Sequence, residues 1–190
     1  MNTLLDIAGS TMIGAIIVMM IISFNYRTQE VSSEVLRSNI TQLNIISVNE
    51  SIENDFYKIG YMHTGDDVFI IAKENEIKFY SDIDNDYSID SVYYFYDTSE
   101  EILTTQNKND FPLYRTVNQG NSQLFAQLTQ FSLTYFDSSN TEISFTDLLN
   151  ETHRKRIKLI EISIRAESND SVNVNYEATE WTKIICPKNL

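Results

Sequence analysis

The stretch IAGSTMIGAIIVMMIISFNY, residues 7–26, decides the fold because it contains twenty residues without a charge. Twenty helical residues span about 30 Å, which is the hydrocarbon thickness of a bilayer. A cleavable secretory signal would have a basic start, a shorter apolar segment and a small-residue cleavage site, and this stretch has none of them. We therefore predict that residues 1–26 form a retained transmembrane and assembly helix.

The helical period continues beyond Tyr26, and no Gly or Pro interrupts it before Gly60. Apolar residues recur at steps of mostly three or four, which predicts one helix over about residues 3–58. Within it, residues 27–59 form an amphipathic continuation whose apolar stripe must be covered. We expect the following domain to pack on this stripe; a coiled-coil partner is the alternative. The stripe consists of Val31, Val35, Leu36, Ile40, Leu43, Ile46, Phe56 and Ile59, widened by Ile45, Val48 and Ile52.

Residues 60–190 have the pattern of a β-sheet domain. Short segments rich in β-branched and aromatic residues alternate with clusters of Asp, Asn, Ser and Gly. Residues 168–171 are short enough for a hairpin turn, so the strands on either side of them are predicted to be antiparallel. The fold class is therefore α+β, with the long N-terminal helix packed against a mostly antiparallel sheet. The predicted strands are Val68–Ala72, Glu76–Ser81, Ser91–Tyr96, Leu113–Val117, Leu128–Phe136, 160–167 and 172–179.

Composition and motifs exclude several functions. The 27 acidic residues outnumber the 14 Lys and Arg residues, giving a net charge of -13, whereas neutralising phosphates requires a basic surface. Nucleic acid is thus not an expected partner. The basic run 153–158 is interpreted as solvated residues at the start of a strand. The single Cys186 cannot form an intramolecular disulfide. His63 and His153 belong to no zinc-protease, hydrolase or P-loop motif, so we do not expect an enzyme.

An acidic loop follows the second predicted strand. Asp82, Asp84, Asp86 and Asp90 occupy positions 1, 3, 5 and 9 of an EF-hand-like calcium loop, with Ser88 at position 7. Oxygen ligands at this density suit Ca²⁺ better than Zn²⁺ or Cu²⁺. The loop lacks two features of that motif, since position 6 is Tyr instead of Gly and position 12 is Tyr instead of Glu. Two interpretations stay open: a calcium loop without flanking EF-hand helices, completed by a further acid such as Asp66, Asp67 or Asp97, or a solvated turn.

Asp6 lies at the edge of the apolar run. A carboxylate near hydrocarbon costs a few kcal/mol unless it is paired, so an ionisable residue there is a candidate for function. The alternative is an interfacial aspartate in the first helical turn, which the helix dipole favours.

The order of these segments resembles a known family. Thr3-Leu4-Leu5-Asp6, the apolar helix, its amphipathic continuation and the sheet are similar to type IV pilins and the pseudopilins of type II secretion systems. Further short segments resemble the minor pilin, or J-type minor pseudopilin, branch. They are Ile52–Tyr61, Phe79–Asp86, Ile89–Tyr94, Leu113–Arg115 and Phe131–Asp137.

The resemblance implies a function and a location. The chain would be a structural subunit of a pilus-like or pseudopilus-like filament, held in the membrane by a single helix with its C-terminal domain outside the cytoplasm. Its partners would be copies of itself or other pilin-like subunits, an inner-membrane assembly platform, and lipid before assembly. Asp6 would stand where the family has a glutamate that pairs with a neighbouring subunit's terminal amine, although the basic leader of that family is absent. The alternative is a membrane-anchored, adhesin-like binding domain with a calcium-ordered loop.

Overall fold

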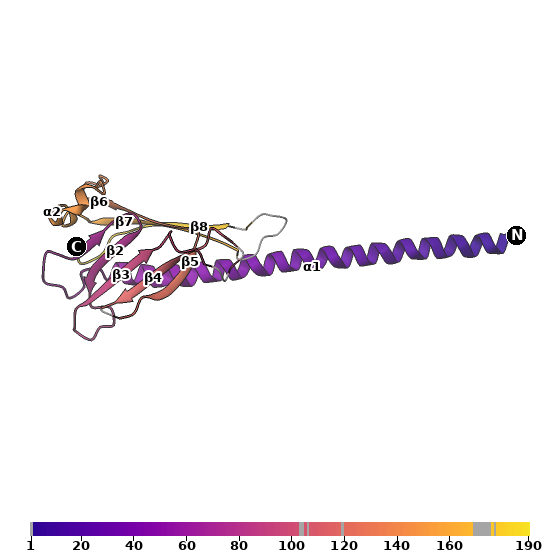
Figure 1. The fold of residues 1–190 in the computed structure, drawn as a ribbon, viewed down its shortest axis with the longest axis horizontal. Coiled ribbons are helices and arrows are strands. Elements are labelled where there is room, and N and C mark those ends of the chain that lie inside the picture. The colour runs from indigo at the N-terminus through magenta and orange to yellow at the C-terminus, as the bar shows by residue number, and fades with distance from the viewer. Residues whose placement is uncertain (1, 103–104, 106, 119, 169–175, 177) are drawn as a thin grey trace. The chain divides into compact units, whose positions relative to one another are not determined.

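The computed structural model describes residues 2–102, 105, 107–118, 120–168, 176 and 178–190 (Figure 1). The chain divides into two compact units, Met1–Ile40 and Thr41–Leu190. Helix α1 (Asn2–Tyr57) forms the described part of the first unit and begins the second, which agrees with the predicted helix over residues 3–58 to within one residue at each end. The uninterrupted helix follows from a sequence that has no Pro and no helix-ending Gly over this range.

The second unit contains two antiparallel sheets. Five strands form a meander in the order β1-β2-β3-β4-β5, and three more form a second sheet in the order β6-β7-β8. Together with α1 they give the predicted α+β class. A short 3-10 helix η1 (Asp147–Leu149) and helix α2 (Glu151–Arg154) connect β6 to β7. The strands are β1 (Phe69–Ala72), β2 (Glu76–Ser81), β3 (Asp90–Tyr96), β4 (Phe111–Val117), β5 (Gln123–Leu128), β6 (Gln130–Phe136), β7 (Leu159–Glu167) and β8 (Ala178–Ile185).

The end of α1 is the centre of the core. Ile52, Phe56 and Ile59 are fully buried, and the ring of Phe56 lies 5.8 Å from those of both Phe79 on β2 and Tyr94 on β3. Burying one such apolar side chain contributes about 1.5–3 kcal/mol. The alternating residues Ile160, Ile162 and Ile164 of β7 complete the same core from the second sheet. The sheet domain is therefore built around the last turns of the helix.

The predicted amphipathic packing applies to only part of the helix. Ile45, Ile52, Phe56 and Ile59 of the stripe are buried in the second unit, and Val48 is half-buried. Val31, Val35, Leu36, Ile40, Leu43 and Ile46 are instead at least half exposed. Leu43 and Ile46 belong to the second unit, where they lie beside the face that meets the sheets. Covering of the stripe before Thr41 by the sheet domain stays a prediction.

The strand predictions need two corrections. Residues 128–136 are not one strand: Leu128 ends β5, Gln130 begins β6, and the chain changes sheets at Thr129, whose backbone N–H donates to the carbonyl of Arg165 at 2.9 Å. Strand β5 was not predicted at all. β7 and β8 pair antiparallel, and Ala178 and Thr179 are the residues of the predicted last strand that take part in this pairing. The predicted turn at 168–171 and most of the predicted strand 172–179 fall on residues 169–175 and 177, outside the described residues, and β8 begins only at Ala178.

Candidate functional site

The apolar part of α1 is the first candidate site. The stretch Thr3–Leu36 is long and apolar enough to cross a membrane, which is compatible with a single-pass membrane protein. Its large apolar side chains between Leu4 and Phe24 are 45 to 74% exposed. The hydroxyls of Ser10 and Thr11 donate to the carbonyls of Ile7 and Ala8, each at 3.0 Å. Because these hydroxyls are satisfied within the helix, they do not oppose its contact with lipid.

Asp6 and two glycines lie in the first turns of this helix. Asp6 is exposed and lies between the apolar residues Leu5 and Ile7 in the sequence. A Cβ added at Gly9 or Gly14 would meet no atom of the chain within 4 Å, so packing inside the chain does not require glycine at either position. Small residues allow another helix to approach closely in a membrane.

The acidic loop is the second candidate site. One carboxylate oxygen from each of Asp82, Asp84 and Asp86 lies within 4.8 Å of the other two. Among the described residues, this group has enough carboxylates, at a suitable spacing, to hold a metal ion. Asp82 is buried and its two oxygens accept the backbone N–H groups of Asp86 at 3.2 Å and Tyr87 at 3.1 Å. Carboxylates brought together in this way are the hard oxygen donors that Ca²⁺ prefers, so the three residues fit this ion.

The other predicted calcium ligands lie differently. Asp90 begins β3, where it pairs with Ser81, and its carboxylate accepts from the backbone N–H of Ile83 at 3.2 Å and from Asn118 Nδ2 at 2.7 Å. Ser88 is exposed and donates its backbone N–H to Asp86 Oδ1 at 2.7 Å. The structure thus brings together the first three predicted ligands, whereas the carboxylate of Asp90 bonds to Ile83 and Asn118 and is not part of that group.

The three further acids considered for this shell are engaged elsewhere or lie outside the group. Asp67 Oδ1 is 3.1 Å from His63 Nε2, and Asp97 accepts from the hydroxyl and the backbone N–H of Ser99. Asp66 is exposed and is not part of the three-residue group. A bound Ca²⁺ would have to complete its shell with backbone carbonyls or water.

We expect calcium binding to depend on this group of three. Ca²⁺ should bind the 41–190 fragment weakly, with a dissociation constant of about 10⁻⁴–10⁻³ M, because the bidentate Glu of an EF-hand is missing. Asp84→Asn should abolish the binding heat in calorimetric titration, whereas Asp66→Asn should leave it unchanged. If about millimolar Ca²⁺ gives neither heat nor a thermal shift, the loop is a solvated turn.

Tyr87 has a backbone conformation that glycine normally adopts. Its φ is 69°, at the loop position where an EF-hand has Gly, and its side chain is 84% exposed. A left-handed backbone costs an L-residue about 1–2 kcal/mol. Tyr87→Gly should therefore raise the unfolding free energy of the 41–190 fragment by about 1 kcal/mol in urea denaturation. Ser88→Gly is the matched control, because Ser88 has no positive φ, and a gain of equal size in that variant would contradict the explanation.

A buried polar triad joins α1 to the first sheet. Asp55 Oδ2 accepts from the hydroxyl of Tyr94 at 2.6 Å and from Arg115 Nε at 2.7 Å, and Asp55 is only 4% exposed. Burial, reinforced by the charge of Asp55, holds the pKa of Tyr94 well above its usual value, so its hydroxyl stays a donor. The sequence analysis missed this triad. The available signal was a charged residue between the apolar positions Ile52, Phe56 and Ile59 of the stripe.

Asp110 is another buried carboxylate, 2% exposed, and its Oδ2 has no hydrogen-bond partner among the described residues. Burial, together with the charge of Glu167, raises its pKa despite a hydrogen bond from Thr105. A raised pKa means that the folded state holds the proton more tightly than the unfolded state, so this contribution to stability is lost as pH rises through the folded pKa.

The unfolding free energy of Asp110→Asn minus that of the parent should therefore increase as pH rises from about 3 to about 7. Urea unfolding of both forms of the 41–190 fragment across this range measures the difference. Asp97→Asn serves as a control with the opposite slope, because hydrogen bonds from Ser99 lower the pKa of Asp97. A difference between Asp110→Asn and the parent that is independent of pH would show that Asp110 does not titrate as described.

Comparison with known proteins gives no assignment. No protein-family model matches the chain. No curated protein and no solved structure matches it either. Assignment of function therefore depends on the residues and their geometry.

The residues considered for catalysis are held in local contacts. His63 stacks on Tyr80 with ring centroids 5.0 Å apart, and His153 Nδ1 lies 3.8 Å from Asp147. Cys186 is exposed.

In the basic run 153–158, Lys155 pairs with Glu151 at 3.1 Å. Arg154 donates to three backbone carbonyls, and Arg156 pairs with Asp137 at 3.0 Å.

Proposed function

We propose that this chain is a structural subunit of a filament of the type IV pilus or type II secretion pseudopilus kind, assembling through its hydrophobic N-terminal helix. The observation that carries the proposal is the apolar stretch Thr3–Leu36, whose large side chains between Leu4 and Phe24 are exposed. Lipid covers such a surface in a single subunit, and other apolar helices can cover it in an assembly. The resemblance of the sequence to minor pilins favours an assembly in which other apolar helices cover this surface.

The continuity of α1 supports this proposal. The helix that carries the apolar stretch also supplies Ile45, Ile52 and Phe56 to the core of the sheet domain. An anchor alone needs only a flexible tether, whereas a filament needs its subunits to be held firmly to the helices that pack together. In the proposed assembly the sheet domain lies outside the cytoplasm, and the filament is at the cell surface or in the periplasm.

Asp6 has a defined role in the proposed assembly. Its carboxylate would pair with the terminal amine of a neighbouring subunit, which offsets the cost of placing a charge at the edge of hydrocarbon. The partners would be copies of this chain or other pilin-like subunits, together with an inner-membrane assembly platform that extracts the helix from lipid.

Electron microscopy of material sheared from cells tests the proposal. We expect filaments that contain this chain by immunolabelling, and we expect them to disappear when the gene is deleted and to return with the intact gene. A chain that remains only in the membrane as a monomer would contradict the filament.

A second candidate is a membrane-anchored binding domain of the adhesin kind. The observation that favours it is the Asp82, Asp84 and Asp86 group, which could order an exposed recognition loop around Ca²⁺. The first helix distinguishes the two functions. An anchored domain should keep its function when residues 7–24 are replaced by another apolar helix of equal length, whereas a filament subunit should lose it.

A further inference from the structure

Exposed apolar side chains gather at the end of α1 and in the acidic loop. Tyr57, Tyr61, Met62, Tyr87 and Ile89 are 37%, 37%, 47%, 84% and 40% exposed, and together we call them the Tyr-Met patch. They are half of the ten large apolar residues described as exposed in Thr41–Leu190, yet they come from two short segments. Single exposed apolar residues are ordinary, but a group of them marks an interaction surface.

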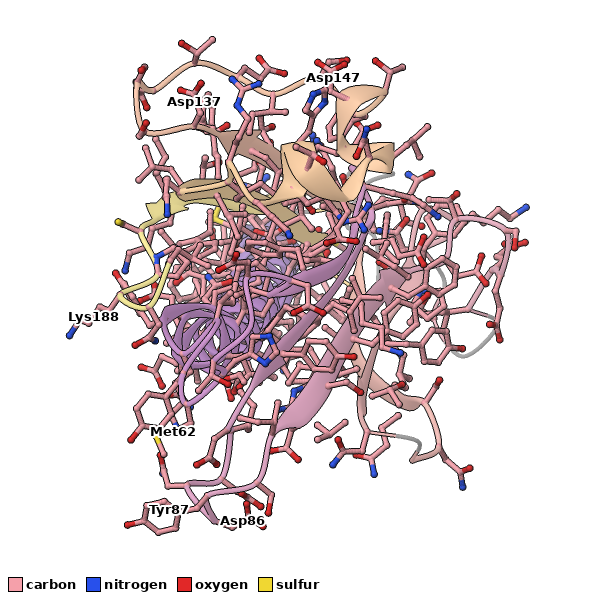
Figure 2. All side chains as sticks on the ribbon, turned by 90° about the vertical axis from the view of Figure 1, so that its left-hand side faces the viewer. Met62, Asp86, Tyr87, Asp137, Asp147 and Lys188 are labelled. Atoms are coloured by element: carbon pink, nitrogen blue, oxygen red, sulfur yellow. The ribbon has the colours of Figure 1, made fainter. Side chains whose placement is uncertain are left out.

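The two segments of the patch lie next to each other. The backbone N–H of Asp82 donates to the carbonyl of Tyr61 at 3.0 Å, and Lys58 Nζ donates to the carbonyl of Ile83 and to Asn85 Oδ1. Tyr57 and Tyr61 also line a shallow open basin with Lys188. Figure 2 shows Met62 and Tyr87 projecting from the same side of the domain, with Asp86 beside Tyr87.

Two residues of the patch have an unfavourable backbone conformation. Met62 has a φ of 62° and Tyr87 a φ of 69°. The other described non-glycine residues with positive φ are Asn85, Asn118 and Asn140, and Asn tolerates this conformation better than other side chains do. Glycine would be the less costly residue at both patch positions. Tyr87 is mostly solvent-exposed and Met62 is about half exposed, so burial gives little reason for a large side chain at either position. Backbone strain of this kind concentrates at functional sites.

The rim of the patch is acidic next to Tyr87, whereas Lys58 and Lys188 lie beside Tyr57 and Tyr61. Asp84 and Asp86 are exposed beside Tyr87, and residues 80–106 contain seven acids and no Lys or Arg. The chain's own basic run is a poor complement to this rim, because Arg154, Lys155 and Arg156 are engaged with carbonyls and carboxylates of their own domain. Complementary charge therefore favours a different protein over a second copy of this chain.

We propose that the Tyr-Met patch is a docking surface for a different protein, whose contact region has an apolar centre framed by Lys and Arg. Tyr87 and Met62 supply the apolar contact, and Asp84 and Asp86 pair with the basic frame. This inference does not depend on the filament, since an anchored monomer would present the same surface.

Site-specific photo-crosslinking in the full chain, in its native membrane, tests the proposal. The probe is a benzophenone amino acid placed at Tyr87, and the matched control places it at Leu149, which is 73% exposed in η1. We expect the probe at Tyr87 to give one adduct with another protein, at least about fivefold stronger than any adduct at Leu149. Mass spectrometry should identify a protein with a Lys- and Arg-rich surface at the crosslinked position.

Three changes should reduce this adduct by at least about fivefold: Met62→Ser, the double change Asp84→Asn and Asp86→Asn, and about 0.5 M NaCl. Resistance of the 41–190 domain to limited proteolysis confirms that each variant is folded. The proposal is overturned by an adduct with a second copy, by equal adducts at Tyr87 and Leu149, or by no protein adduct. It is also overturned if a calcium chelator removes the adduct while salt does not, because the acids would then act through a metal.

Discussion

Arg115→Met should lower the unfolding free energy of the sheet domain by about 3–5 kcal/mol, because it leaves the Asp55 carboxylate buried without its cation. Arg115 Nε lies 2.7 Å from Asp55 Oδ2, and the Asp55 side chain is only 6% exposed. The Tyr94 hydroxyl would remain as a neutral donor to that oxygen. One hydrogen bond of this kind contributes about 1–3 kcal/mol, which is too little to offset the burial of an unpaired charge.

Urea denaturation of the 41–190 fragment measures this effect. Arg115→Met combined with Asp55→Asn should be more stable than Arg115→Met alone, because the second change removes the unpaired charge. Tyr94→Phe, which keeps the ion pair, should cost only about 1–2 kcal/mol. If Arg115→Met costs less than Tyr94→Phe, the ion pair does not hold the helix to the sheet.

Asp6→Ala should reduce the incorporation of this chain into filaments by at least about tenfold, since it removes the carboxylate proposed to pair with a neighbouring subunit's amine. The sheet domain begins more than thirty residues later, and its described core residues start at Ile45, so its folding should not change. Quantitative immunoblotting of the sheared filament fraction against the membrane fraction gives the ratio.

Asp6→Glu is the matched control and should keep most of the incorporation, because it retains the charge. The Asp6→Ala chain should accumulate in the membrane, since its helix is more apolar than that of the parent. Normal incorporation of Asp6→Ala would assign Asp6 to the interface between membrane and water, where the helix dipole alone accounts for it.

The sequence was sufficient for the elements whose pattern is strong. Helix α1 follows from an apolar run and a helical period without Pro, and β7 follows from the strict alternation of Ile160, Ile162 and Ile164 with polar residues. These patterns arise because one face of each element meets the core, so the period of burial is visible in the residue types.

Where the chain changes direction without a turn residue, the sequence misled us. Residues 128–136 are rich in β-branched and aromatic residues throughout, and the change of sheet at Thr129 occurs without Gly or Pro. The hydrogen bonds that fix it come from Thr129 to Arg165, 36 residues away, and a local pattern contains no trace of such a contact.

The acidic loop shows the same limit. The spacing of Asp82, Asp84 and Asp86 correctly predicted that their carboxylates converge. It could not predict that Asp90 turns to Asn118, because that contact depends on β4 ending beside the start of β3. Likewise, no local pattern indicates that Asp55 faces Arg115, 60 residues further along the chain.

The proposed filament depends on contact between the apolar helices of neighbouring subunits, and cysteine crosslinking in the native membrane measures this contact directly. After Cys186→Ser, a single cysteine is introduced at Gly9 or Gly14, where an added Cβ meets no atom of the chain within 4 Å. Ser139→Cys, in an exposed loop, is the control. We expect disulfide-linked dimers from at least one of the two helix positions, and their loss when Asp6→Ala is added. Only monomers at both positions, under oxidation that links a known membrane dimer, would contradict assembly through this helix.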